Sequence, residues 1–175
     1  MAAKRAEEIM IPLDRYPHIP HWYTLRQAIA ELRASQLEVQ GRLSLPRAVL
    51  VFNKAYELLG IVRRRDILRG LEPRFLAGDS REYERRLFDV QVDPNLSDFS
   101  SDRMLREIRA QAERPVSDVM APIGATVRHD DHLMKIVHEM LKHDLSLIPV
   151  LKDGRVVGVV RSVDLLNEVA DIVLS

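Results

Sequence analysis

Hydrophobic positions in the C-terminal third of the chain predict a helix, a hairpin and a second helix. The apolar runs 147–151 and 156–160 are rich in Val, Leu and Ile and are joined across Asp153-Gly154, a pattern typical of a tight β-hairpin. Both runs are nearly continuous, so we expect the hairpin to be buried on both faces. Apolar residues recur at spacings of three and four over 133–141 and again over 165–173, which predicts an amphipathic helix on each side of the hairpin.

The residues that precede these two helices are types that commonly begin helices. We expect Asp130 and Asp131 to provide the N-cap and a first-turn acid of the first helix, and Ser162 or Asp164 to cap the second. A helix-capping role needs no ligand, so an aspartate here is not by itself a sign of a binding site.

The same order of elements occurs earlier in the chain. An apolar stripe over 25–32 is followed by strand-like runs at 49–52 and 58–62, and Asp66 then opens a helix. In both copies a glycine of the second run precedes the helix-start aspartate by six residues: Gly60 and Asp66, and Gly158 and Asp164. The openings are also alike: Glu8-Ile9-Met10-Ile11-Pro12 and Asp118-Val119-Met120-Ala121-Pro122. This internal repeat predicts two diverged copies of one small α/β unit.

The copies differ most in the middle, where the first has an inserted segment near 38–46. We expect the stretch 37–45 to lengthen the strand system by a further pairing. Between the copies, a polar, arginine-rich connector carries apolar residues at helical spacing after Ser101-Asp102, and 80–87 is expected to form another short helix. The chain therefore divides into three parts: 1–70, 71–114 and 115–175.

Composition is that of a soluble globular protein. The chain is 46% hydrophobic and 30% charged, and no apolar run approaches the roughly 18 residues of a membrane-spanning helix. The absence of cysteine excludes disulfides and thiolate metal sites, so we expect a cytoplasmic protein. Basic and acidic residues number 26 each, and this zero net charge disfavours nucleic-acid binding, although the connector arginines keep it as a third hypothesis.

No arrangement of residues predicts catalysis. The chain lacks a Gly-x-Ser-x-Gly elbow and a Walker phosphate loop, so we expect it not to be an enzyme. His129 and His132 flank two aspartates, which are chemically suitable metal ligands. Because those aspartates are already explained as helix-start residues and no zinc spacing recurs, we favour a structural role and expect no metal site.

The repeated pattern resembles the CBS domain, named after cystathionine β-synthase, which occurs in tandem pairs known as Bateman modules. The match is closer in the second copy, roughly 116–170, through Val119-Met120-Ala121-Pro122, Ile148-Pro149-Val150, Asp153-Gly154 and the run from Gly158 to Leu166. The first copy, roughly 7–70, has the same opening and closing motifs. The resemblance implies an α/β (α+β) fold of two βαββα repeats packed about a pseudo-twofold axis, with a helical connector and two clefts between the repeats.

The resemblance also implies a function. Members of the family bind adenosine-type ligands in these clefts, such as AMP, ADP, ATP or S-adenosylmethionine, while others bind other nucleotides or only magnesium, and two pairs commonly form a disc-like dimer. We therefore expect a non-catalytic, homodimeric sensor that requires no cofactor, binds an adenine nucleotide and regulates an unidentified partner protein. The alternative is a ligand-free scaffold for dimerisation and protein interaction.

In the family, the junction between the second hairpin strand and its helix reads Gly-x-x-Thr/Ser-x-x-Asp. The carboxylate accepts hydrogen bonds from ribose hydroxyls, and the hydroxyl and helix N-terminus face phosphate. This chain keeps the carboxylates as Asp66 and Asp164 but has Arg63 and Arg161 at the hydroxyl positions. An arginine at this position either clamps a phosphate or pairs with the neighbouring aspartate and abolishes binding. The second copy is the better candidate because its motif is closer to that of the family.

By the same resemblance, backbone groups near the opening strands and at the first hairpin strands would contact the base. The residues concerned are Ile11, Pro12, Ala121, Pro122, Leu147, Ile148, Pro149, Val49 and Leu50.

Overall fold

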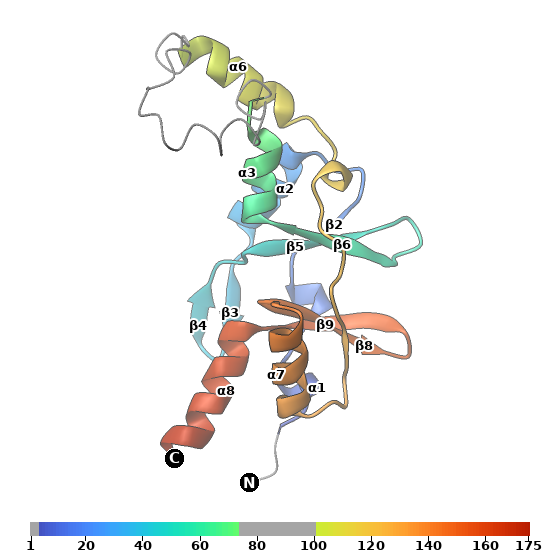
Figure 1. The fold of residues 1–175 in the computed structure, drawn as a ribbon, viewed down its shortest axis with the longest axis vertical. Helices are drawn as coiled ribbons and strands as arrows, with labels where there is room; N and C mark the ends of the chain where they lie inside the picture. The colour runs from blue at the N-terminus through green and yellow to red at the C-terminus, as the bar shows by residue number, and fades with distance from the viewer. Residues whose placement is uncertain (1–3, 74–100) are drawn as a thin grey trace, which may run out of the picture.

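The computed structural model describes residues 4–73 and 101–175 of the chain. Two sheets lie face to face at the centre of the molecule, with helices on the outer side of each (Figure 1). This arrangement confirms the predicted α/β fold with two similar units. The short helix expected over 80–87 lies outside the described residues.

Each half contains a parallel strand, an antiparallel hairpin and helices in the same order. The first sheet has the order β2 (His18–Pro20), β5 (Ala48–Phe52), β6 (Leu58–Arg63). The second has the order β1 (Ile11–Pro12), β9 (Arg155–Arg161), β8 (Leu147–Lys152), β7 (Val127–Arg128). The described α-helices are α1 (Ala6–Ile9), α2 (Leu25–Ala34), α3 (Arg64–Leu71), α6 (Ser101–Gln111), α7 (Leu133–Lys142) and α8 (Ser162–Leu174). The internal repeat and the helix expected after Ser101-Asp102 are therefore confirmed.

The opening segment of each half lies on the sheet of the other half. In β1, Ile11 pairs with Val159 of β9. In the equivalent place of the first sheet, the Ala121 amide donates to the Ile61 carbonyl at 2.8 Å and the Ile61 amide donates back at 2.9 Å. Ala6 and Ile9 of α1 accordingly belong to the core of the second half.

The exchanged segments explain the two glycines at matching positions. A Cβ atom on Gly158 would lie 2.6 Å from the carbonyl oxygen of Ile11, and one on Gly60 would lie 2.6 Å from that of Ala121. Real side chains do not tolerate such a distance, so glycine is needed where the opening segment of the other half crosses the strand.

The stretch 37–45 forms a separate two-stranded sheet, so the expectation that it lengthens the main strand system is wrong. Strands β3 (Leu37–Val39) and β4 (Arg42–Ser44) pair only with each other among the named strands. Gln40 and Gly41 form their turn with φ of 52° and 73°, the left-handed pair that a two-residue hairpin loop of type I′ requires.

The expected helix caps are also wrong. The N-cap of α7 is His132, and Asp131 instead closes the preceding turn by accepting the Arg128 amide at 2.8 Å. The N-cap of α8 is Arg161, and its side chain makes no capping bond. The three aspartates expected at these helix starts, Asp130, Asp131 and Asp164, all have side-chain cations as partners, which compete with the free backbone amides of the helix.

Three apolar clusters hold the described residues together. One lies within each half, and the third joins the two sheets. This third cluster contains Ile11, Tyr16, Leu37, Leu50, Phe52, Leu147 and Val159. The halves are therefore packed through a continuous apolar core.

Candidate ligand-binding site

A pair of oppositely charged residues lies at each junction between a hairpin and the following helix. Arg63 ends β6 and Asp66 lies in the first turn of α3, while Arg161 ends β9 and Asp164 lies in the first turn of α8. The spacing i, i+3 places both members of each pair on the same side of the helix start. These are the residues to which the sequence assigned the ribose and phosphate contacts.

The Arg161–Asp164 pair is enclosed by protein. Nε of Arg161 donates to Oδ2 of Asp164 at 2.6 Å and Nη2 donates to Oδ1 at 2.7 Å. The remaining nitrogen, Nη1, donates to Oγ of Ser44 at 2.7 Å. The side chains of Arg161 and Asp164 are 11% and 6% exposed, so this two-bond ion pair lies largely out of water.

The Arg63–Asp66 pair has the same two-bond geometry but is more open. Nε and Nη2 of Arg63 donate to the two carboxylate oxygens of Asp66 at 2.7 Å and 3.0 Å, and the Arg63 amide donates to Oδ2 at 2.9 Å. The Asp66 side chain is 1% exposed, whereas that of Arg63 is 33% exposed. The arginine therefore reaches solvent while its partner does not.

Electrostatics favour the ionised form of this pair. Burial opposes ionisation of Asp66, but the hydrogen bonds from Arg63 outweigh it and hold the pKa of the carboxyl below its usual range. The same bonds raise the pKa of the Arg63 guanidinium. This strand–helix junction thus holds a fixed anion and a fixed cation side by side.

The structure sorts the expected base-contact residues into two groups, one on each sheet. On the second sheet, β9 is flanked by Leu147, Ile148 and Pro149 on one side and by Ile11 and Pro12 on the other. This group therefore accompanies Asp164.

On the first sheet, β6 is flanked by Val49 and Leu50 and, through the exchanged segment, by Ala121, which Pro122 follows. This group accompanies Asp66. Val49 and Leu50 are fully buried, backbone included, so neither is open to a ligand in this structure.

Sequence reasoning missed the residues that cover the Arg161–Asp164 pair. Tyr16 is 2% exposed and donates its hydroxyl to the Ala48 carbonyl at 2.8 Å. Burial raises the pKa of this hydroxyl, with opposing contributions from Arg161, which lowers it, and Asp164, which raises it. The inserted segment supplies Ser44 as well. Its extra length was visible in the sequence, but nothing local indicated where it would pack.

Two grooves are hollowed into the described surface. One, of about 340 Å³, lies beside the inserted hairpin and is lined by Ile11, Arg15, Gln36, Leu37 and Glu38. The other, of about 760 Å³, lies between the turns of the two main hairpins. Its lining includes Tyr56, Ile123, Thr126 and Arg155 but neither of the two arginine–aspartate pairs.

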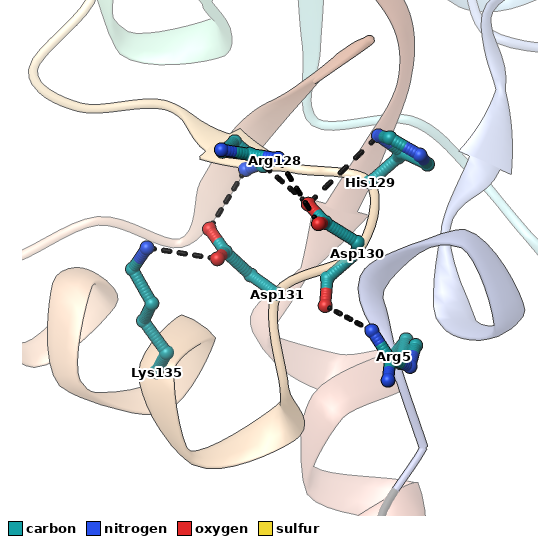
Figure 2. Close-up of polar contacts among 6 residues, drawn as sticks. All are labelled: Arg5, Arg128, His129, Asp130, Asp131 and Lys135. Carbon is teal, nitrogen blue, oxygen red and sulfur yellow. Dashed lines mark hydrogen bonds and ion pairs between the residues drawn. The ribbon is translucent and has the colours of Figure 1, made fainter.

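The aspartates before α7 form a compact charged cluster (Figure 2). Arg128 donates from Nε and Nη2 to the two carboxylate oxygens of Asp130, both at 3.0 Å, and Nζ of Lys135 donates to Asp131 at 2.8 Å. Arg5 joins the N-terminal segment to this loop through the Asp130 carbonyl at 3.0 Å.

Ion pairing therefore accounts for both of these carboxylates. In the parts of the chain that the structure describes, no group of three His, Asp or Glu residues is arranged to hold a metal ion. Within the same residues, no helix combines the length and the apolar character needed to cross a membrane.

Comparison with known proteins gives a family match for the second half of the chain. Residues 116–171 match the family model described as "CBS domain". An uncharacterised protein, MJ1004, of Methanocaldococcus jannaschii is 36% identical over 61 residues, which are 33% of this chain and only 28% of that relative.

Solved structures match over a longer part of the chain. CBSX2 from Arabidopsis thaliana has a TM-score of 0.64 at 15% identity, covering 99% of both chains. CBSX2 in complex with AMP has a TM-score of 0.61 at 16% identity, covering 96% of this chain and 97% of the other. The CBS domain of a membrane protein from Sphaerobacter thermophilus has a TM-score of 0.64 at 21% identity, covering 94% and 87%. Residues 116–171 thus match the family model of the CBS domain, and the chain as a whole has the fold of a CBS pair.

Proposed function

We propose that this protein is a non-catalytic regulatory module that binds an adenine nucleotide in the cleft at Asp66 and communicates binding to a partner protein. The observation that carries the proposal is the pair of Asp66 and Arg63, an acceptor for ribose and a solvent-accessible cation for phosphate at one strand–helix junction. The proposal is supported by the AMP complex of CBSX2, a protein of the same fold.

Binding would exchange the partners of these two side chains. Arg63 would turn from the carboxylate to a ligand phosphate, and the freed oxygens of Asp66 would accept hydrogen bonds from the ribose hydroxyls. Both charges keep a partner, so the exchange avoids leaving Asp66 buried and unpaired. A ligand that selects this arrangement would shift the pair of repeats between two states, which is the basis of a signal.

The sequence favoured Asp164, whereas the geometry leads us to propose Asp66 as the binding carboxylate. Arg161 is enclosed and bonded to both Asp164 and Ser44, so freeing it would disrupt more contacts. Arg63 is three times as exposed, at 33% against 11%.

The wider assignments are part of the same proposal. We take 1–70 and 115–175 as the two repeats, with 71–114 as the connector, and the protein as a cytoplasmic homodimer. Large apolar side chains exposed on the helices of the second half support pairing with a second copy: Met134, Leu141, Leu166 and Ile172.

Thermal unfolding with AMP and adenosine tests the ligand assignment. At about a hundred times its dissociation constant, a ligand stabilises by about 2.7 kcal/mol, which raises the melting temperature of a chain of this size by about 5–11 °C. Asp66→Asn should abolish the shift with AMP, and Asp164→Asn should leave it. Arg63→Thr should reduce the preference for AMP over adenosine. Arg65→Thr, two residues further along in the first turn of α3, is the matched control and should keep that preference.

A ligand-free scaffold is the second candidate, and one observation favours it: both aspartates already have arginine partners within the chain. Under this hypothesis no shift occurs with AMP, ADP, ATP or S-adenosylmethionine, and the protein still forms a dimer by light scattering. That result would refute nucleotide binding.

A further inference from the structure

The helices on the outer side of the second sheet carry a group of exposed apolar side chains. Met134 and Leu141 lie two turns apart on α7. Val163, Leu166 and Val173 lie along one side of α8. Each of these five residues is more than half exposed. Because α7 and α8 pack side by side (Figure 1), we define the five residues as the apolar face of the second repeat.

The equivalent surface of the first repeat has a different chemistry. When the helix starts of the two repeats are aligned, three apolar positions of the second repeat correspond to exposed arginines of the first. The pairs are Met134 and Arg26, Leu141 and Arg33, and Val163 and Arg65. One position is leucine in both repeats: Leu166 is 66% exposed and Leu68 is 68% exposed. The repeats therefore share a fold but not an outer surface.

The outer surface of the first repeat is also partly covered by its own chain. Helix α6 packs against α3. Glu113, two residues after α6, pairs with Arg26, and the Arg26 amide donates to the Ala112 carbonyl at 2.9 Å. No segment among residues 4–73 and 101–175 covers the apolar face of the second repeat in this way, and exposed apolar surface of this kind marks an interaction site.

Two copies of the chain can bring these surfaces together in three ways, and charge distinguishes them. The apolar face against the first repeat of another copy would bury arginine side chains among apolar ones, which is costly. The first repeat against itself would place like charges across the interface. The second repeat against itself buries apolar side chains against apolar side chains, and a two-fold axis allows one surface to be its own partner.

The charged residues of α7 and α8 permit this third pairing. Four of them have side-chain partners within their own chain: Lys135, Glu139, Asp164 and Glu168. The other two, Lys142 and Asp171, are exposed and of opposite sign, so they can stay in water at the polar rim of an interface. Self-pairing therefore leaves no charge of α7 or α8 buried without a partner.

We infer that two copies of this protein associate through the apolar face of the second repeat, with α7 and α8 of one copy against α7 and α8 of the other. The arginine-bearing helices of the two first repeats do not meet. This inference rests on the homodimer part of the proposed function, is independent of nucleotide binding, and adds which repeat supplies the interface. A disc in which both repeats of each copy meet would bring the arginine surface into the interface.

Sedimentation equilibrium of the full chain without ligand tests the inference. A buried leucine side chain changes an association constant by about tenfold or more, and a two-fold interface contains it twice, so Leu166→Asp should raise the dissociation constant of the dimer by about a hundredfold or more. Leu68→Asp, at the matching and similarly exposed position of the first repeat, is the control and should leave the constant unchanged. If Leu166→Asp loses the circular dichroism spectrum of the wild type, Leu141→Asp replaces it, because that side chain is 77% exposed.

The outcomes separate this interface from the homodimer itself. A dimer weakened by Leu166→Asp and not by Leu68→Asp supports the inference. A dimer weakened by both variants, by neither or by Leu68→Asp alone overturns the inference and leaves the homodimer standing. A protein that stays monomeric at every concentration overturns both, whereas nucleotide binding is decided separately by thermal unfolding.

Distances between labels test which repeats lie close together. The chain contains no cysteine, so Lys142→Cys on α7 and Ala34→Cys on α2 each accept one spin label per copy at matching, exposed positions. Electron paramagnetic resonance should give a shorter distance between the two labels at position 142 than between the two at position 34. Equal distances, or a shorter one at position 34, would contradict pairing through the second repeat alone.

Discussion

Replacement of Gly158 by alanine should destabilise the protein, because the exchanged opening segment passes directly over this position. A Cβ there would lie 2.6 Å from the carbonyl oxygen of Ile11 and 2.8 Å from Sδ of Met10. The methionine side chain can move aside. The carbonyl belongs to the backbone of β1, so the strand itself would have to shift away from β9.

The expected size of the effect follows from two opposing contributions. Overpacking in a closely packed region costs about 1–3 kcal/mol. Alanine also reduces the conformational freedom of the unfolded chain, which favours the folded state by about 0.4–1 kcal/mol. The net loss is therefore about 1–2 kcal/mol. For a chain of this size, that corresponds to a fall of about 2–8 °C in the melting temperature.

Thermal unfolding followed by circular dichroism measures this loss, and Gly124→Ala provides the control. At Gly124 the nearest atom to a new Cβ is Cδ2 of Leu145, at 3.1 Å, on a side chain that can rotate. Hydrogen exchange should also show faster exchange in β1 of the Gly158 variant. A Gly158→Ala protein as stable as the wild type, with β1 equally protected, would refute the exchange of opening segments.

Three further predictions concern the ion pairs and the exchange. Asp66→Asn should lower the free energy of unfolding by about 2 kcal/mol at pH 7. Because the pKa of Asp66 is lowered in the folded state, the stability from its charge is fully present above the unfolded pKa of about 3.9 and is lost as pH falls through the folded pKa. Urea unfolding should therefore show the stabilities of the two proteins converging below about pH 4. Arg161→Ala should lower the free energy of unfolding by about 3–5 kcal/mol, because it leaves a buried carboxylate unpaired. Arg63→Ala should lower it less, because water reaches that pair. Urea unfolding of the two variants measures the difference. A fragment of residues 115–175 should not fold alone, since it lacks α1 and β1. A peptide of residues 1–16 should restore the circular dichroism spectrum of a folded fragment. A fragment that folds without the peptide would contradict this prediction.

The elements that sequence predicted correctly are those whose signals are local. The hairpin at 147–160 is marked by two β-rich runs and an Asp-Gly turn, and the helices by apolar spacing. The repeat follows because the same local signals recur in the same order. The helix caps failed because Asp131 and Asp164 have side-chain cations nearby, and a capping motif does not show which partner a carboxylate will take.

The exchange of opening segments was beyond the reach of the sequence for a different reason. The opening segments 8–12 and 118–122 have similar apolar patterns and equal lengths, so either could pack at the edge of either sheet. Gly60 and Gly158 showed that something approaches closely, but a glycine does not identify what approaches it. The choice depends on the path of the chain between the repeats, which no local pattern records.

The candidate site illustrates the same division between local and long-range information. The pairing of Arg161 with Asp164 was one of two alternatives open at a separation of three residues, whereas the bond from Arg161 to Ser44 joins residues 117 apart. Both junctions have an arginine and an aspartate at the same spacing, and the motif alone favoured the junction of Arg161 because the second copy is closer to the family. The long-range contact makes them different, because it buries one arginine and leaves the other in reach of solvent. We therefore expect the insertion that breaks the symmetry of the duplicated fold to decide which copy of the shared motif binds a ligand, which a comparison of the two motifs alone does not show.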